Sequence, residues 1–182
     1  MKGVVFTEFL DLVESNYGME VADRVLTKGF PNDTGFTSVG TYDHRILISL
    51  IMEFSDAIGK SPKEVVFIFG KYLFHRLRAI YPESTNGVNS SIDLVLKVEA
   101  VIHGEVMKLY PDAEVPSFAF PASTDGTFQV EYLSARPFAD LAEGLLQGCI
   151  EHFGDNLQLE RIDLEGEPGT HALFRFLPKP AT

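Results

Sequence analysis

The sequence predicts an α+β protein, with a helical N-terminal part followed by a four-stranded antiparallel sheet packed with helices. Two observations support this class. Apolar residues recur at helical spacing through residues 1–110. Beyond them, apolar and polar residues alternate in short runs separated by turn residues, which is typical of strands. One further amphipathic helix lies between two such pairs of runs.

The first three predicted helices each end at a glycine, the residue that most often follows a helix. Apolar residues mark the first of them from Val5 onward. The three helices cover about residues 5–17, 21–28 and 43–58, and they end at Gly18, Gly29 and Gly59.

The fourth predicted helix has a clear start signal. Ser61 can cap it, Pro62 suits the first helical position, and Glu64 completes a capping box. The helical pattern continues to about Ile80 and ends before Pro82, because proline cannot continue a helix.

A polar loop at 83–90 leads into a long apolar helix at 91–109, which Pro111 ends. Asp125-Gly126 is a strong hairpin turn signal between two alternating runs. The elements that follow the long helix are strands at 117–122 and 127–134, a helix at 138–153 opened by Pro137, and a last hairpin of 156–163 with 171–177 across the turn at 165–169.

Composition excludes several classes of function. The formal net charge of −11 argues against nucleic-acid binding and against anionic membrane surfaces. No apolar run reaches the ~18 residues of a membrane span. Glu8, Asp11 and Glu14 interrupt the N-terminal apolar stretch, so it does not read as a secretory signal, and we expect a cytoplasmic protein. P-loop, G-x-S-x-G, H-E-x-x-H and G-x-G-x-x-G patterns are absent, and we expect no catalytic residue.

His103 is the first candidate functional residue, in the segment VEAVIHGEVMKLYP. A single imidazole on an apolar helix face suits the proximal side of a heme, where the nitrogen ligates iron and hydrocarbon receives the porphyrin. A lone histidine there is also typical of a core residue with a satisfied hydrogen bond, so this feature alone leaves both interpretations open. Its helix face also carries Leu96, Ala100, Val106, Met107 and Tyr110.

Tyr132, Ser134 and Arg136 form the second candidate cluster. They lie two residues apart, so on a strand all three point to one face. Two hydroxyls and a guanidinium form a donor set suited to carboxylates. The alternative is an ordinary polar strand face that meets solvent.

The ordered set of these motifs resembles the heme-nitric oxide/oxygen-binding (H-NOX) family, which is related to the heme domain of soluble guanylate cyclase. The Y-x-S-x-R spacing follows the histidine as in that family, and MKGVVF, KLYPDAEVP and ADLAEGLLQGC resemble it at matching places. The resemblance covers essentially the whole chain. It implies one domain over residues 1–182, with heme b bound non-covalently between a helical part at about 1–65 and a heme-clamping part at about 66–182.

The resemblance also implies roles for individual residues. His103 matches the axial iron ligand, and Tyr132, Ser134 and Arg136 match the clamp on the heme propionates. Pro116 matches the proline that distorts the porphyrin. Family members that bind O2 stably carry a distal tyrosine where this chain has Leu141, which cannot donate a hydrogen bond. The positions that match the distal wall are Val5, Phe9, Leu73, Leu77, Leu141 and Leu145.

This apolar distal wall predicts binding of NO and CO at ferrous heme and exclusion of O2, since bound O2 needs a distal donor. The resemblance further implies a bacterial stand-alone signalling protein. In it, NO weakens the His103 bond, and the resulting shift regulates a histidine kinase or a cyclic-di-GMP synthase or phosphodiesterase.

Three alternatives to this interpretation remain open at this point: a heme enzyme, an O2 sensor or carrier, and a protein-interaction domain. A heme enzyme such as a peroxidase or oxygenase needs distal acid/base groups or a thiolate ligand, which the distal positions lack. An O2 sensor or carrier is disfavoured by Leu141. A protein-interaction domain without cofactor would purify colourless. A zinc site is not expected, because Cys149 is the single cysteine and His171 lies far from it in sequence.

Overall fold

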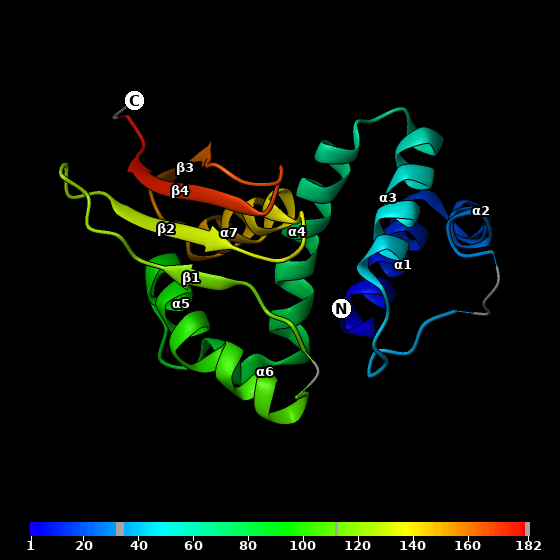
Figure 1. The fold of residues 1–182 in the computed structure, drawn as a ribbon, viewed down its shortest axis with the longest axis horizontal. Helices are drawn as coiled ribbons and strands as arrows, with labels where there is room; N and C mark the ends of the chain where they lie inside the picture. The colour runs from blue at the N-terminus through cyan, green and yellow to red at the C-terminus, as the bar shows by residue number, and fades with distance from the viewer. Residues whose placement is uncertain (32–34, 112, 181–182) are drawn as a thin grey trace.

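The computed structural model describes residues 1–31, 35–111 and 113–180. Within these ranges it confirms the α+β class (Figure 1). The helices are α1 (Gly3–Tyr17), α2 (Met19–Gly29), α3 (His44–Ile58), α4 (Pro62–Ile80), α5 (Ser91–Lys97), α6 (His103–Leu109) and α7 (Ala139–Phe153). The strands are β1 (Ser117–Ala119), β2 (Phe128–Leu133), β3 (Leu157–Asp163) and β4 (His171–Pro178). None of the described helices is long and apolar enough to cross a membrane.

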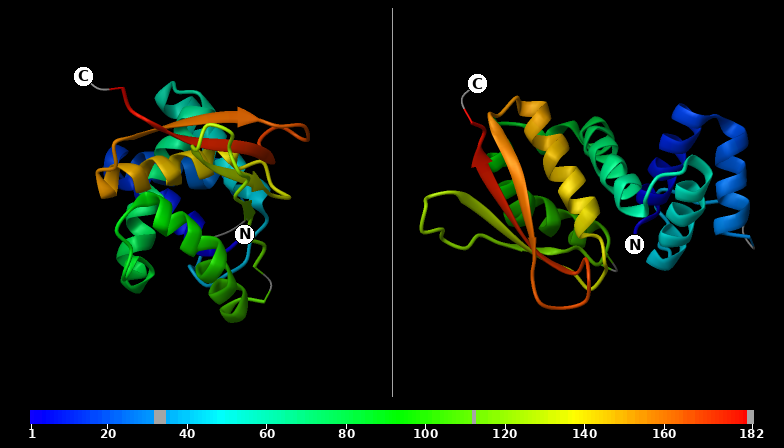
Figure 2. Two further views of the ribbon diagram at one scale, coloured as in Figure 1. Left: turned by 90° about the vertical axis from the view of Figure 1, so that its left-hand side faces the viewer. Right: turned by 90° about the horizontal axis from the view of Figure 1, so that it is seen from above.

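Helices α1, α2 and α3 gather on one side of the molecule, and the sheet lies on the other side (Figures 1 and 2). Helix α4 runs between these two parts (Figure 1). Its predicted capping box is present, since Ser61 Oγ accepts from the Glu64 amide at 3.3 Å and Glu64 Oε2 accepts from the Ser61 amide at 3.0 Å. The start of this central helix is therefore encoded locally.

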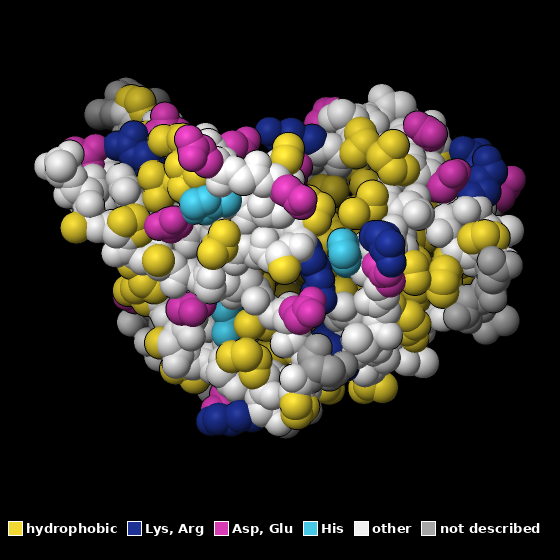
Figure 3. Space-filling model, in the orientation of Figure 1, with side chains coloured by type: hydrophobic (Ala, Val, Ile, Leu, Met, Phe, Trp, Pro, Cys, Tyr) yellow, Lys and Arg dark blue, Asp and Glu magenta, His cyan; other side chains and the backbone are white. Residues whose placement is uncertain are grey.

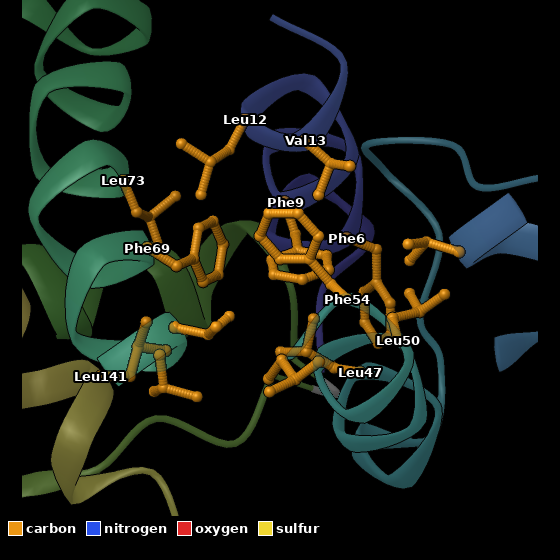
Figure 4. Packing of buried hydrophobic residues seen from close by; sticks show 14 of the residues in the cluster. Phe6, Phe9, Leu12, Val13, Leu47, Leu50, Phe54, Phe69, Leu73 and Leu141 are labelled. Atoms are coloured by element: carbon orange, nitrogen blue, oxygen red, sulfur yellow. The ribbon is translucent and has the colours of Figure 1, made fainter. Parts of the chain in front are cut away.

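The core of the N-terminal part is a cluster of aromatic and aliphatic side chains between α1, α3 and α4 (Figure 4). Phe9 packs edge-on against Phe54 and Phe69, with ring centroids 5.9 and 5.1 Å apart. A charged pair lies beside this core: Glu8 is 5% exposed, and Arg76 of α4 donates from Nε to its Oε2 at 2.5 Å. Apolar packing and this ion pair together hold α1 on α4.

Helices α4 and α7 meet backbone to backbone. A Cβ placed on Gly144 would lie 2.2 Å from the carbonyl oxygen of Phe67, and one on Gly70 would lie 2.5 Å from that of Leu141. Only glycine at these two positions allows this approach. Arg161 of β3 fixes the other side of α7, donating to Glu143 at 3.1 Å and pairing with Asp140.

The four described strands form one antiparallel sheet in the order β1-β2-β4-β3. Its inner face packs on α7 through buried side chains that include Val130, Tyr132, Phe174 and Ile150. The predicted strand at 117–122 is too long, because β1 ends at Ala119. The next residue but one is a proline, which cannot donate to a ladder.

The predicted long helix at 91–109 is helical throughout, but its middle turn is different. Between α5 and α6, residues Val98–Ile102 form a π-helical turn. A π turn inserts one extra residue into the helix and is often found at functional sites. The predicted loop at 83–90 likewise begins in a short 3-10 helix, Pro82–Thr85.

Candidate functional site

His103 is the first residue of α6, directly after the π turn. Its side chain is 14% exposed, and Nδ1 lies 3.1 Å from Oε2 of Glu99. Its ring packs against Phe118 of β1 with centroids 5.4 Å apart. Among the described residues, no hydrogen bond is found for the second ring nitrogen, Nε2. The ring is thus held on one side and has a nitrogen left to bind a ligand.

Glu99 also binds the first strand, because its Oε2 accepts from the backbone amide of Phe118 at 3.1 Å. One carboxylate oxygen therefore joins the His103 ring to β1. Sequence reasoning missed Glu99 and Phe118. The signal for Glu99 was available, since a residue four positions before a histidine lies on the same helix face. The contact with Phe118 is long-range and had no local signal.

The structure brings Tyr132, Ser134 and Arg136 together. The Tyr132 side chain is buried on β2, and the Ser134 hydroxyl and the Arg136 guanidinium both lie close enough to influence the pKa of its phenol. Burial raises the pKa of the Tyr132 phenol above its ordinary value, so the phenol stays protonated and can donate at neutral pH. Ser134 Oγ accepts from the Arg136 amide at 3.1 Å.

The reason for this proximity differs from the prediction. The sequence placed all three residues on one strand face, but β2 ends at Leu133 and the chain then bends. The Arg136 amide is turned to the Ser134 side chain, and Pro137 has no amide to extend the ladder. A turn, rather than strand alternation, brings Arg136 back to the cluster.

The Arg136 side chain already holds a carboxylate. It forms an ion pair with Glu114, and its Nη1 also donates to the Glu114 carbonyl oxygen at 3.3 Å. Arg136 is only 15% exposed at its side chain, whereas Glu114 is 69% exposed. A guanidinium that is mostly covered and paired with an exposed surface carboxylate is suited to exchange that partner for another carboxylate.

The six positions predicted to form the distal wall belong to one apolar cluster. Phe9, Leu73 and Leu141 are among its buried members, and Val5, Leu77 and Leu145 pack against it. Figure 4 shows Phe9 of α1, Leu73 of α4 and Leu141 of α7 converging from three helices. None of these side chains carries a hydrogen-bond donor. Their contact with a cofactor stays a prediction.

Other predicted residues lie near the site or away from it. Pro116 directly precedes β1 and is half-buried. Cys149 is buried in α7, and burial raises the pKa of its thiol to about 12, so the thiol is inert at neutral pH. His171 lies on β4 and binds Glu131 at 2.7 Å. The structure describes no cluster of three or more metal-ligating side chains in these ranges.

The donor set fits a heme. His103 offers one ring nitrogen, the residues of the distal cluster are apolar, and Arg136 provides a positive group beside two hydroxyls. In the space-filling view, the surface is hollowed between the N-terminal helices and the sheet part, and apolar, basic and acidic side chains border the hollow (Figure 3). Imidazole, hydrocarbon and carboxylate-binding groups are the three surfaces that a heme requires.

Comparison with known proteins agrees with this fit. Residues 2–161 match the family described as Haem-NO-binding. A Shewanella woodyi H-NOX solved with IWP-051 in the Fe(II)CO state is 38% identical, with a TM-score of 0.83 and coverage of 99% of this chain and 95% of that one. The unliganded Fe(II) H-NOX protein from K. algicida is 29% identical, with a TM-score of 0.86 and coverage of 100% and 98%.

The Fe(II)NO form of an H-NOX protein from S. oneidensis is 27% identical, with a TM-score of 0.89 and coverage of 99% and 100%. The comparison with curated proteins gives no match. Sequence and fold together define a heme-binding gas-sensor domain. The chain belongs to the Haem-NO-binding family, whose solved bacterial members are called H-NOX proteins. Domains of this family act as sensors rather than enzymes.

Proposed function

We propose that this chain binds heme b non-covalently through His103 and senses nitric oxide, with CO as a second ligand and O2 excluded. The observation that carries the proposal is the state of the His103 ring. Nδ1 is engaged by Glu99 at 3.1 Å, which leaves the lone pair of Nε2 for iron. Metal-ligating histidines typically bind a carboxylate through their other nitrogen in this way.

The heme supplies a ferrous iron that binds diatomic gases. The side chains of the distal wall determine which gas binds more tightly. Phe9, Leu73 and Leu141 are buried and apolar, so the distal wall offers no donor for the partial negative charge of bound O2. NO needs no such donor, and the axial histidine and the pocket polarity are the levers that the protein controls. An apolar wall therefore supports NO selectivity.

Tyr132, Ser134 and Arg136 are proposed to hold the propionates. A tyrosine phenol is protonated at neutral pH, and burial raises the pKa of the Tyr132 phenol further, so it can donate to a carboxylate. The Arg136 guanidinium would exchange the Glu114 carboxylate for a propionate. Pro116, beside β1, is proposed to press on the porphyrin. These roles rest on the family resemblance together with the observed cluster.

The proposed output is a shift between a helical part at about 1–65 and a heme-clamping part at about 66–182. Release of His103 would free the helix that carries it, and a partner that prefers one arrangement would read the change. We propose a histidine kinase or a cyclic-di-GMP synthase or phosphodiesterase as that partner. This choice of partner rests on the family resemblance.

The visible absorption spectrum of the reduced, purified protein tests the proposal. We expect a heme spectrum that changes with CO and with NO and stays unchanged in O2. A stable O2 complex would contradict the exclusion of O2 and would indicate an O2 sensor. Turnover of peroxide would instead indicate a heme enzyme, and a colourless protein that takes up no added heme would contradict heme binding altogether.

Replacing Leu141 with tyrosine tests the polarity argument. The side chain is buried in the distal cluster, so a phenol there adds one donor to an apolar wall. We expect Leu141→Tyr to bind O2 measurably while Leu141→Phe, of similar size but without the hydroxyl, does not. An equal response of both variants to O2 would show that volume, rather than polarity, controls the ligand. The measurement is an O2 titration of the ferrous protein.

A further inference from the structure

We propose that Glu99 is a positioning residue that sets the tautomer, the orientation and the donor strength of His103. This inference rests on the proposed function, since it assumes that His103 is the iron ligand. It adds Glu99, which the sequence analysis did not name, to the residues that act on the proposed heme. Glu99 acts on His103 in three ways: it selects the tautomer of the ring, it is itself anchored to β1, and it brings a negative charge to Nδ1.

The contact with Glu99 determines which ring nitrogen of His103 carries the proton. A carboxylate only accepts hydrogen bonds, so a proton between Nδ1 and Glu99 Oε2, 3.1 Å apart, must sit on the ring nitrogen. Neutral imidazole carries one proton. Nε2 is then the nitrogen with the free lone pair, and it is ready to ligate a metal.

A second hydrogen bond anchors the Glu99 carboxylate to β1. The same Oε2 accepts from the Phe118 amide at 3.1 Å, so the carboxylate cannot rotate away without losing a bond to β1. The Phe118 ring packs on the His103 ring at 5.4 Å and on the Tyr132 ring at 6.1 Å. His103 is thereby held from its own helix and from β1, which pairs with the strand that carries Tyr132.

The negative charge of Glu99 also affects how strongly His103 would bind iron. A negatively charged acceptor at Nδ1 makes Nε2 more basic than a neutral acceptor would, which strengthens its bond to iron. A stronger bond opposes the release of His103 on NO binding. Glu99 would thus set how readily the proposed signal is produced, while Phe118 supplies only a fixed point.

Two substitutions separate geometry from charge. Glu99→Gln keeps an oxygen acceptor for both bonds and removes the charge, whereas Glu99→Ala removes both. The control is Glu105→Gln, on the same helix, where the exposed carboxylate binds Lys108 at 2.7 Å and does not contact His103. Circular dichroism checks that each variant folds.

Three readouts apply. Ring ¹⁵N shifts of the full chain before heme loading report the His103 tautomer, the iron–histidine stretching band of the ferrous protein reports bond strength, and transfer of heme to excess apomyoglobin reports retention. We expect Glu99→Ala to lose the single tautomer and to release heme about 10-fold faster or more. Glu99→Gln should keep the tautomer but lower the stretching frequency. Glu105→Gln should match the wild type.

The outcomes distinguish this inference from the proposed function. A wild type that shows the stretching band, with both Glu99 variants unchanged in all readouts, would overturn the role of Glu99 and leave heme sensing intact. A wild type that takes up no heme would refute the proposed function. In that case the role of Glu99 toward iron falls with it, while the ring shifts still report whether Glu99 sets the tautomer.

Discussion

A His103→Gly variant is expected to lose most of its heme on purification and to regain it when imidazole is supplied. The glycine removes the ligating nitrogen but leaves the surrounding cavity, because His103 is only 14% exposed and lies between Glu99 and Phe118. Even loss of a partner outside the ligand shell costs about 10–100-fold in metal affinity. Loss of the ligand itself should therefore lower the heme content of the purified protein by more than about tenfold.

The heme-to-protein ratio from the pyridine hemochrome assay is the measurement, with and without added imidazole. His171→Gln is the control, because that ring lies on β4 and binds Glu131 instead. Retention of full heme content by His103→Gly without imidazole would mean that another residue ligates the iron. Loss of heme by the control would mean that the sheet part as a whole had been disturbed.

A Gly144→Ala substitution is expected to destabilise the fold, because it would push helices α4 and α7 apart. Its Cβ would lie 2.2 Å from the Phe67 carbonyl oxygen and 2.9 Å from the Gly70 Cα. Both are backbone atoms, so only separation of the helices relieves the overlap. Overpacking costs about 1–3 kcal/mol. At roughly 2–4 °C per kcal/mol for a chain of this size, the Tm should fall by several degrees.

Gly148→Ala is the matched control one turn along α7. Its Cβ would meet Lys71 and Phe74 at 3.2 Å, a contact that small shifts can relieve. Alanine also gains about 0.8–1.0 kcal/mol of helix propensity over glycine. We expect this variant to unfold within a few degrees of the wild type. Equal Tm values for the two variants in thermal unfolding by circular dichroism would show that the helices can separate without cost.

Local signals in the sequence predicted most of the fold. The start of α4 followed from Ser61, Pro62 and Glu64, because a capping box is satisfied within one turn. The second hairpin followed from strand alternation on both sides of a turn. The α+β class and the family were confirmed for the same reason: they depend on patterns that are local or on motifs in a fixed order.

Two kinds of feature could not be predicted from the sequence: a local change of helix type and contacts between distant segments. The π turn before His103 has the same apolar residues as an α-helix, so periodicity cannot reveal it. The Glu99–Phe118 bond joins a helix to a strand, and the pairing of Arg136 with Glu114 joins two loops. Residue type and spacing identified His103, Tyr132, Ser134 and Arg136 as candidates, the family resemblance gave them their roles, and those roles remain predictions.

The ion pair between Glu8 of α1 and Arg76 of α4 restricts how α1 can move relative to α4. Glu8 is buried, so separating it from the partly exposed Arg76 leaves a carboxylate charge without compensation inside the protein. A slide of α1 along α4 by one turn would separate the two groups. A small rotation about an axis through them would keep both bonds, at 2.5 and 3.3 Å. Mechanically, this contact would act as a pivot: it would oppose a translation of α1 along α4 more than a small rotation about the ion pair.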